Sequence, residues 1–219
     1  MIYAIIAAGG IGSRFGADKP KQLVEIDGES ILTRTAKIFD GMDIIERVIV
    51  ACPPARLGEC REVLSGLRKT EVISGGRTRN ETVMNAVDFI EEKFGLDEET
   101  IAVTHDAVRP FVTEKIILDS IDAAEKYGAS VAATESVDTV IECENGFITS
   151  IPDRRKMFRV QTPQTFGALK LRRLYNELSD SEKETLTDCS KIFVLRGEKV
   201  AVVQGDPANI KITFKSDLK

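Results

Sequence analysis

The sequence has very few of the residues that histidine-based and metal-based chemistries need. Its 219 residues include one histidine, His105, which excludes His-rich zinc sites and the two-histidine metalloprotease helix within a single chain. The four cysteines contain no Cys-x-x-Cys pair and are too few for a disulfide framework. We therefore expect reduced, mostly buried thiols and a cytoplasmic protein.

An excess of basic charge and a long apolar run are also missing. Lysine and arginine total 30 against 35 aspartates and glutamates, which gives a net charge of −5. A globally basic surface for nucleic acid is therefore not expected, although a local basic pocket remains compatible with this total. The longest apolar run, Met1 to Ala8, is too short to span a bilayer and has no signal-peptide flanks. We expect no nucleic-acid partner and no membrane partner.

What the chain does contain is a regular alternation of short apolar runs and helical periods. The pattern predicts strands at 2–7, 48–51, 71–73, 101–105 and 131–134, and helices at 30–39, from 79, from 113, near 168–178 and from 187. Ser30 and Thr113 are suitable helix caps. This order predicts an α/β fold with a doubly wound, mostly parallel sheet covered on both faces. The length fits one large domain or a small pair.

The rhythm changes at Val137. Residues 137–151 form two extended segments around Asn145-Gly146, which is a strong signal for a hairpin turn. Such an arm has little room for a core of its own, so we expect it to pack on something else, such as a second subunit. Two closing strands are predicted after it, at 199–203 and 210–213.

A glycine-rich loop, Ala7–Gly16, directly follows the first predicted strand. Glycines let backbone N–H groups approach phosphate oxygens closely, and Arg14, Lys19 and Lys21 add three cations nearby. The combination indicates a polyphosphate site, with a solvated surface turn as the alternative. The loop satisfies neither the P-loop spacing nor the dinucleotide fingerprint, because Phe15 stands where a third glycine belongs. An ATPase or an NAD-dependent enzyme is therefore disfavoured.

Two more groups of polar residues follow other strand ends. Asp106 can hold Mg²⁺ against nucleotide phosphates, and Arg109 can bind a phosphate. His105 is interpreted as a hydrogen-bonded structural residue, since nothing else in the chain indicates a nucleophile–histidine–acid triad. A second glycine turn, Gly75-Gly76, opens a helix and favours an anion or a polar base edge.

Together these motifs resemble a known family. Ala-Ala-Gly-Gly-Ile-Gly-Ser-Arg followed by Lys-Pro-Lys-Gln is similar to the signature of sugar- and polyol-phosphate nucleotidyltransferases. The later motifs occur in the order of its cytidylyltransferase branch, which includes ribitol-5-phosphate and 2-C-methyl-D-erythritol 4-phosphate cytidylyltransferases. These later motifs are Gly-Gly-x-x-Arg, His-Asp-Ala-x-Arg-Pro, Asp-Thr, Asp-Arg, Thr-Pro-Gln, Thr-Asp and Asn-Ile-Lys.

The resemblance spans nearly the whole chain and implies its organisation and activity. It implies one Rossmann-like domain over residues 1–219, a homodimer formed through an arm at about 137–160, and transfer of CMP from CTP with Mg²⁺ as cofactor. An acceptor phosphate oxygen would attack the α-phosphorus of CTP and pyrophosphate would leave. The attacking phosphate is already anionic, so no general base is required.

The resemblance also implies residue roles, all numbered in this sequence. The catalytic residues would be Arg14, Lys21 and Lys211. The nucleotide-binding residues would be Ala7, Ala8, Gly9, Gly10, Gly12, Ser13, Gly76, Arg77, Arg79, Thr82, Asp106 and Ala107. The acceptor-binding residues would be Arg109, Thr139, Arg154, Thr162, Thr187 and Lys211, with Arg154 reaching the site of the other subunit. Asp106 would be the metal ligand.

The acceptor is the most open part of this assignment. The methylerythritol branch commonly has an aspartate before Asn-Ile-Lys as a second metal carboxylate, and this chain has Ala208 there, with Asp206 as a nearby substitute. The stretches at 103–106, 151–154, 161–166 and 186–193 resemble the ribitol-phosphate branch better. We therefore expect D-ribitol 5-phosphate as acceptor. The alternative is the methylerythritol phosphate enzyme of isoprenoid biosynthesis, and the distant alternatives are an NAD-dependent oxidoreductase and a non-catalytic nucleotide-binding module.

Overall fold

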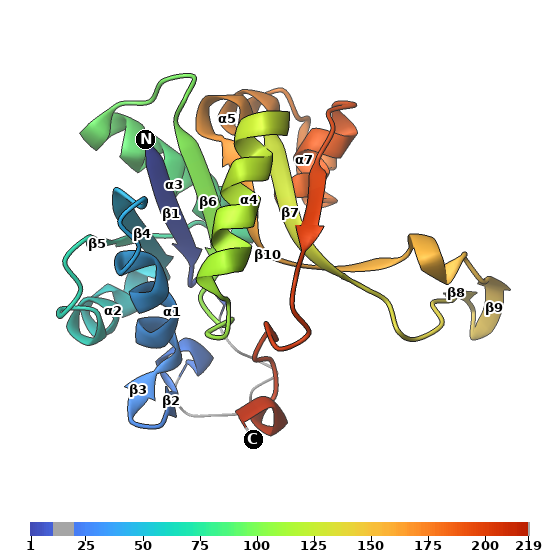
Figure 1. Ribbon diagram of the computed structural model, residues 1–219, viewed down its shortest axis with the longest axis horizontal. Helices are drawn as coiled ribbons and strands as arrows, with labels where there is room; N and C mark the ends of the chain where they lie inside the picture. The colour runs from blue at the N-terminus through green and yellow to red at the C-terminus, as the bar shows by residue number, and fades with distance from the viewer. Residues whose placement is uncertain (11–19, 219) are drawn as a thin grey trace.

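The computed structural model describes residues 1–10 and 20–218, and its centre is a seven-stranded sheet (Figure 1). The strand order is β11-β7-β10-β6-β1-β4-β5, and β10 is antiparallel to both of its neighbours. The other neighbouring pairs are parallel. The strands are β1 Ile2–Ala7, β4 Arg47–Cys52, β5 Thr70–Ser74, β6 Ile101–Asp106, β7 Ala129–Glu135, β10 Phe158–Gly167 and β11 Ala201–Gln204. The predicted α/β, mostly parallel architecture is confirmed.

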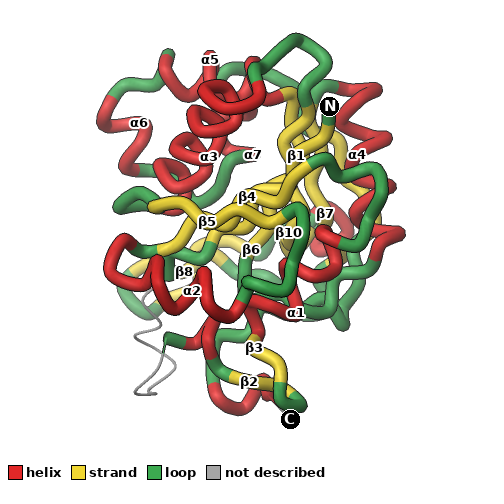
Figure 2. Tube along the Cα trace, turned by 90° about the vertical axis from the view of Figure 1, so that its left-hand side faces the viewer, coloured by secondary structure: helices red, strands yellow, loops and turns green. Residues whose placement is uncertain are grey.

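Helices cover both faces of this sheet (Figure 2). Successive side chains of a strand point to opposite faces, and in β1 Ala4 and Ile6 join one core while Tyr3 and Ile5 join the other. The first core is closed by α1 Ile31–Asp40, α2 Leu57–Val63 and α4 Glu114–Tyr127. The second is closed by α3 Arg79–Phe94, α5 Ala168–Asn176 and α7 Ser190–Leu195, with α6 Asp180–Glu184 between the last two along the chain. This two-sided burial is why β1 and β4 are almost continuously apolar in sequence.

Helices α1 and α4, which start near the carboxyl edge of the sheet, begin at side-chain caps. The hydroxyl of Ser30 accepts the backbone N–H of Thr33 at 3.0 Å, and that of Thr113 accepts the N–H of Ile116 at 3.4 Å. Both caps are as predicted. Ahead of α1 lie a short helical turn, Lys21–Leu23, and a small hairpin of β2 Glu25–Ile26 and β3 Glu29–Ser30.

Two features of the sheet differ from the prediction. Strand β10 was not predicted, because polar residues and Pro163 interrupt its sequence, and proline normally argues against a central strand. Here the pairing register with β7 shifts between Val160 and Gln164, and this irregularity accommodates the proline. The strand predicted at 210–213 is wrong. That segment runs past the turn after β6, where Ile212 donates its N–H to the carbonyl of Val108 at 2.9 Å.

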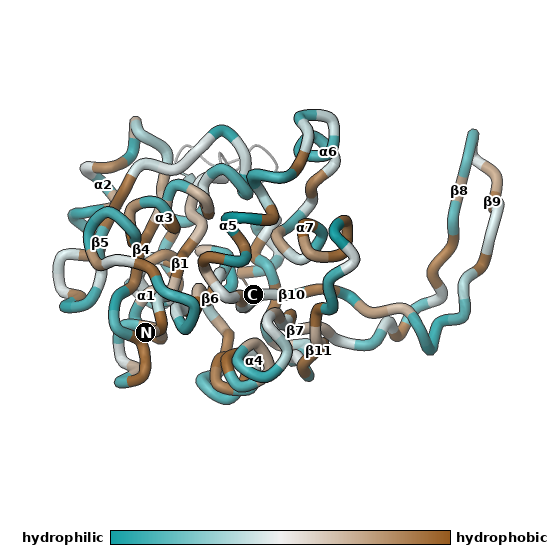
Figure 3. Tube along the Cα trace, turned by 90° about the horizontal axis from the view of Figure 1, so that it is seen from above, coloured by the Kyte–Doolittle hydropathy of each residue, from teal (hydrophilic) through white to brown (hydrophobic). Residues whose placement is uncertain are grey.

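The predicted hairpin is present and projects away from the sheet (Figure 3). It consists of β8 Glu142–Glu144 and β9 Phe147–Ser150, which pair around Asn145 and Gly146. Both turn residues have positive φ, 51° and 84°, as a two-residue type I′ turn requires. The chain enters this arm from the end of β7 and returns through the turn Arg154–Lys156 into β10. Over the residues that the structure describes, no helix has the length and apolar character to cross a membrane.

Candidate active site

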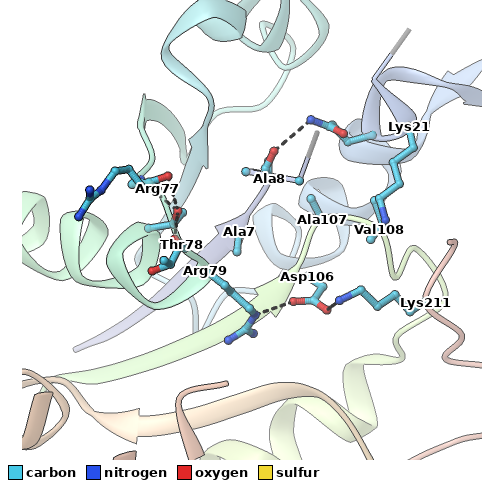
Figure 4. A pocket seen from close by; sticks show the side chains of 15 residues that line it. Ala7, Ala8, Lys21, Arg77, Thr78, Arg79, Asp106, Ala107, Val108 and Lys211 are labelled. Carbon is cyan, nitrogen blue, oxygen red and sulfur yellow. Dashed lines mark hydrogen bonds and ion pairs between the residues drawn. The ribbon is translucent and has the colours of Figure 1, made fainter. Parts of the chain in front are cut away.

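A cavity of about 390 Å³ opens beyond the carboxyl ends of β1 and β6 (Figure 4). Ligands of doubly wound sheets bind at this edge, because the loops after parallel strands converge there. The lining residues come from the glycine loop, the helical turn Lys21–Leu23, the start of α3, the turn after β6 and the segment after β11. They are Ala7, Ala8, Gly9, Gly10, Lys21, Gln22, Gly76, Arg77, Thr78, Arg79, Thr82, Asp106, Ala107, Val108 and Lys211.

The described part of the glycine loop is held by backbone and amide contacts. The N–H of Ala8 donates to the carbonyl of Ala51 at 2.8 Å, which continues the β1–β4 pairing by one residue. The carbonyl of Ala8 accepts the side-chain amide of buried Gln22 at 3.0 Å. The loop therefore leaves the sheet along a fixed path toward Gly9 and Gly10.

The start of α3 forms the opposite wall. The hydroxyl of Thr78 accepts the N–H of Glu81 at 3.1 Å, so this threonine caps the helix. The hydroxyl of Thr82 accepts the N–H of Gly76 at 3.0 Å and donates to the carbonyl of Thr78 at 2.7 Å. Thr82 thus folds the glycine turn back against the helix that follows it.

Asp106 lies at the centre of a cationic cluster formed by Arg79, Arg109 and Lys211. Its Oδ1 is 2.9 Å from Nε of Arg79 and its Oδ2 is 2.8 Å from Nζ of Lys211 (Figure 4). Oδ2 is also 3.8 Å from Nε of Arg109. Burial alone would raise the pKa of Asp106, but the charges of Arg79 and Lys211 outweigh it and hold that pKa well below its usual range. One carboxylate against three cations leaves net positive charge, which favours an anionic ligand.

The two arginines of this cluster are held differently. Arg109 is buried and donates from Nη1 to the carbonyl of Asn209 at 2.7 Å. Arg79 reaches across the cavity, and its Nη2 is a buried donor without a hydrogen-bond partner in the part of the chain described here. A bound anion would satisfy such a donor.

His105 is a buried structural residue, as predicted. One ring nitrogen, Nε2, is 3.1 Å from the carbonyl of Arg109, and the other, Nδ1, is 2.9 Å from the hydroxyl of Thr162. Burial lowers the pKa of His105 to about 4, so the imidazole is neutral at neutral pH.

Some predicted residues lie away from the cavity of their own chain. Thr139 and Arg154 are exposed on the arm, and Thr187 is exposed ahead of α7. Thr162 was expected to bind the acceptor, but it is buried and its hydroxyl is already engaged by His105 and by the N–H of Asp106, at 3.1 Å. Gly12, Ser13 and Arg14 lie outside the described residues.

Three lining residues were not singled out from the sequence: Gln22, Thr78 and Val108. The first two carried a usable signal. Gln22 belongs to the Lys-Pro-Lys-Gln motif, and Thr78 stands three residues before Glu81, as in a helix-capping pattern. Val108 carried none, because an apolar residue in a turn does not indicate which way it faces.

The possible second metal carboxylate, Asp206, is occupied elsewhere. Its Oδ1 accepts the N–H of Ala208 at 2.7 Å, and the residue does not line the cavity. Asp106 is the sole aspartate or glutamate among the described lining residues, and residues 1–10 and 20–218 contain no cluster of three or more metal-binding side chains. One carboxylate fits Mg²⁺, which often binds one protein carboxylate and takes its other ligands from phosphates and water.

The sequence of the chain matches the model of a known protein family. The model of the 2-C-methyl-D-erythritol 4-phosphate cytidylyltransferase family matches residues 2–219. The chain belongs to this family. It is therefore a CTP-dependent nucleotidyltransferase, and neither the oxidoreductase nor the non-catalytic module is supported.

Solved structures agree with this family. The 2-C-methyl-D-erythritol 4-phosphate cytidylyltransferase of Francisella tularensis has a TM-score of 0.85 and 28% identity, over 99% of this chain and 96% of that one. The 4-diphosphocytidyl-2C-methyl-D-erythritol synthase of Anaerococcus prevotii has a TM-score of 0.82 and 28% identity, over 99% and 92%. The Thermus thermophilus cytidylyltransferase, at 24% identity and a TM-score of 0.74 over 100% and 96%, supports the fold alone. The preference for ribitol 5-phosphate is not supported by these matches, which favour the alternative acceptor.

Proposed function

We propose that this chain transfers CMP from CTP to 2-C-methyl-D-erythritol 4-phosphate and releases pyrophosphate. The observation that carries the proposal is the match of residues 2–219 to the family that bears this activity. The cavity supports it, because a glycine loop, a helix start and a cationic cluster meet at one edge of the sheet. Such a site suits a nucleoside triphosphate beside a phosphorylated acceptor.

The nucleotide would lie between the glycine loop and α3. Backbone N–H groups at Gly9 and Gly10 would bind the triphosphate, with Lys21 alongside. Gly76, Arg77 and Thr82 would surround the cytosine and ribose. The polar start of α3 favours this orientation, because a helix N-terminus presents unpaired N–H donors.

The acceptor phosphate would lie at the cationic cluster, near Lys211 and Arg109. One of its oxygens attacks the α-phosphorus of CTP, the bond from that phosphorus to the β-phosphate oxygen breaks, and pyrophosphate leaves with the electron pair. The nucleophile is already anionic, so the neutral, buried His105 has no proton to remove. The residues act by holding two anions together and by stabilising the charge that develops between them.

Magnesium would be held by Asp106 together with substrate phosphate oxygens, where it would neutralise phosphate charge. Lys211 now occupies Oδ2 of Asp106, and the lysine side chain is 44% exposed, so it has room to move to an incoming phosphate. Asp106 would thus change partners when substrates bind.

We also propose that the arm at about 137–160 forms a homodimer. Its apolar side chains are exposed in the single chain, with Phe147 76% and Ile148 59% exposed. Large apolar side chains grouped on a projecting hairpin are typical of a protein–protein interface. Arg154 and Thr139 lie on the same arm, so a partner's arm would bring them to the acceptor site of this chain.

The double variant Phe147→Asp/Ile148→Asp is expected to be monomeric and to lose most of its activity. Two buried carboxylates would oppose the interface, and without it Arg154 would not reach a neighbouring site. Light scattering and pyrophosphate release measure the two effects. The control is Tyr127→Asp, an exposed residue that ends α4 and lies just before β7, at the end of that strand away from the arm. A wild-type protein that is monomeric at assay concentration but active would rule out the arm's role.

Gly76→Ala is expected to raise KM for CTP about tenfold, because the turn proposed to surround the base would be displaced, and 1.4 kcal/mol of lost binding is tenfold. A Cβ at Gly76 would lie 2.9 Å from the backbone carbon of Glu81 and 3.0 Å from the N atom of Thr82, so the turn must shift. Gly58→Ala is the matched control, because nothing lies within 4 Å of its added Cβ. An unchanged KM for CTP in Gly76→Ala would place the base elsewhere.

D-ribitol 5-phosphate is kept as a second candidate acceptor for one observation. The position where the methylerythritol branch commonly has a second metal carboxylate is Ala208, and Asp206 does not line the cavity in its place. The deciding experiment measures pyrophosphate release from CTP and Mg²⁺ with each acceptor side by side. A clear preference for the methylerythritol phosphate is expected, and a preference for ribitol 5-phosphate would overturn the acceptor but not the cytidylyl transfer.

A further inference from the structure

The turn at residues 106–109 is held by backbone hydrogen bonds at each of its four residues. It carries Asp106 and Arg109, and the N–H of Arg109 donates to the carbonyl of Asp106 at 3.1 Å. The next two carbonyls accept bonds from other parts of the fold. Ala107 accepts the hydroxyl of Thr35 at 2.9 Å, and Val108 accepts the N–H of Ile212 at 2.9 Å. The N–H of Ala107 donates to the carbonyl of Ala7 at 3.1 Å. At the two ends of the turn, the N–H of Asp106 and the carbonyl of Arg109 are bound by side chains.

Those two side chains belong to His105 and Thr162, and they are bonded to each other. A carbonyl only accepts, so the 3.1 Å contact with Arg109 places the ring proton of His105 on Nε2. In a neutral ring Nδ1 is then an acceptor, and the hydroxyl of Thr162 donates to it at 2.9 Å. The same hydroxyl oxygen accepts the N–H of Asp106 at 3.1 Å. Donors and acceptors alternate without conflict from one end of the turn to the other.

The surroundings leave this pair little freedom. His105 is fully buried, and its ring centroid lies 5.1 Å from that of Phe39. The carbonyl of Thr162 accepts the side-chain amide of Asn209 at 2.8 Å, and the carbonyl of Asn209 accepts Nη1 of Arg109 at 2.7 Å. The contacts that fix Thr162 therefore also fix the guanidinium of Arg109.

We propose that His105 and Thr162 act as one positioning unit for cytidylyl transfer, which sets where Asp106 and Arg109 stand. Neither side chain lines the cavity, so both act through the turn and neither is a catalytic residue. The roles of Asp106 and Arg109 in this statement rest on the proposed function, whereas the hydrogen-bond chain itself does not. Fixing a charged group in advance matters because small displacements of reacting groups are costly in rate.

The hydrogen-bond chain is tested by NMR without any substrate. The chain has a single histidine, so a sample labelled with ¹⁵N at histidine gives one imidazole and no assignment problem. Long-range ¹H–¹⁵N correlations at neutral pH are expected to show a protonated Nε2 and an unprotonated Nδ1. Thr162→Val should shift the Nδ1 resonance, because it removes its donor. A ring protonated at Nδ1, or one that exchanges between tautomers, would overturn the proposal.

The positioning role of His105 and Thr162 in catalysis is tested by a double-mutant cycle of Thr162→Val and His105→Asn. Each substitution is expected to lower kcat by about 10–100-fold, the usual effect of losing a partner that orients a site residue. The kcat of the double variant should be little lower than that of either single variant, because both substitutions break the same hydrogen-bond chain. Thr162→Ser keeps the hydroxyl and should restore most of the rate.

Thr165→Val is the matched control. Thr165 is a buried threonine of the same strand, and its hydroxyl lies 2.9 Å from that of Ser120, away from the turn. It should cost similar stability in thermal unfolding and leave kcat near that of the wild type. Three results would each overturn the positioning role. They are fully additive losses of kcat in the double variant, an equal loss of kcat in Thr165→Val, and a change in Thr162→Val that is confined to a higher KM for the acceptor. If neither acceptor is turned over, both proposed acceptors are wrong. The NMR experiment then still tests whether the hydrogen-bond chain through His105 and Thr162 exists.

Discussion

Lys21→Ala is expected to lower kcat by about 10²–10³-fold while the protein remains folded, as happens when one preorganised donor to a developing charge is lost. Lys21 lines the same cavity as Asp106 and Lys211, from the short helical turn that precedes α1. Its Nζ lies 3.3 Å from the carbonyl of Ile212, so the ammonium is held near the proposed phosphate site before substrate arrives. A cation fixed in this way stabilises the transition state without reorganising.

The measurement is steady-state pyrophosphate release, with thermal unfolding of the same samples. Lys115→Ala is the matched control, because Lys115 is exposed on α4 and pairs with Asp119 at the surface. It should change neither kcat nor Tm appreciably. A Lys21→Ala variant with near-normal kcat would remove Lys21 from the mechanism, and one that unfolds would require Lys21→Gln in its place.

Much of the fold could be predicted because its strands are buried on both faces. Ile2–Ala7 is a short apolar run for this reason, and the helices between strands show the expected caps at Ser30 and Thr113. The hairpin could be predicted from two residues, since Asn145-Gly146 adopts the positive φ values that its turn needs.

Strand β10 could not be predicted from local sequence preference. Its residues Gln161–Gln164 are polar and include a proline, so their local preference is for a loop. They are nevertheless buried, because β6 and β7 lie on either side of β10. Gln164 pairs with both neighbouring strands, and the three residues before it occupy the irregularity between Val160 and Gln164. The return of the chain from the arm into the middle of the sheet is a long-range event that local periodicity does not record.

The residues of the candidate site could also be predicted only in part. Residues that follow predicted strands, such as Gly9 and Asp106, do line one cavity, because carboxyl ends of parallel strands share an edge. Lys211 entered only through the resemblance, since its contact with Asp106 spans 105 positions. The inward direction of the Thr162 hydroxyl depends on β10, so the sequence assigned this residue to the acceptor and the structure places it under the turn.

Asp106→Asn is expected to destabilise the protein by about 3–5 kcal/mol at neutral pH, which is roughly 6–20 °C in Tm for a chain of this length. The carboxylate is buried and accepts Arg79 at 2.9 Å and Lys211 at 2.8 Å, with Arg109 at 3.8 Å. A neutral amide would leave these cations close together without a counter-charge. Transfer activity should fall as well, because the proposed magnesium ligand is lost.

The dependence on pH gives this prediction its sharpest test. The folded pKa of Asp106 lies well below the unfolded value of about 3.9, so its stabilising contribution is fully present above about pH 4 and is lost as the pH falls through the folded pKa. The stability gap between wild type and Asp106→Asn, measured by urea unfolding, should therefore stay constant from neutral pH down to about pH 5 and narrow only below about pH 4. Asp119→Asn, which removes the surface carboxylate paired with Lys115, should show a far smaller gap throughout. A gap for Asp106→Asn that closes near pH 6 would mean that this carboxyl is not held ionised by its cations, and the charge balance assigned to the site would be wrong.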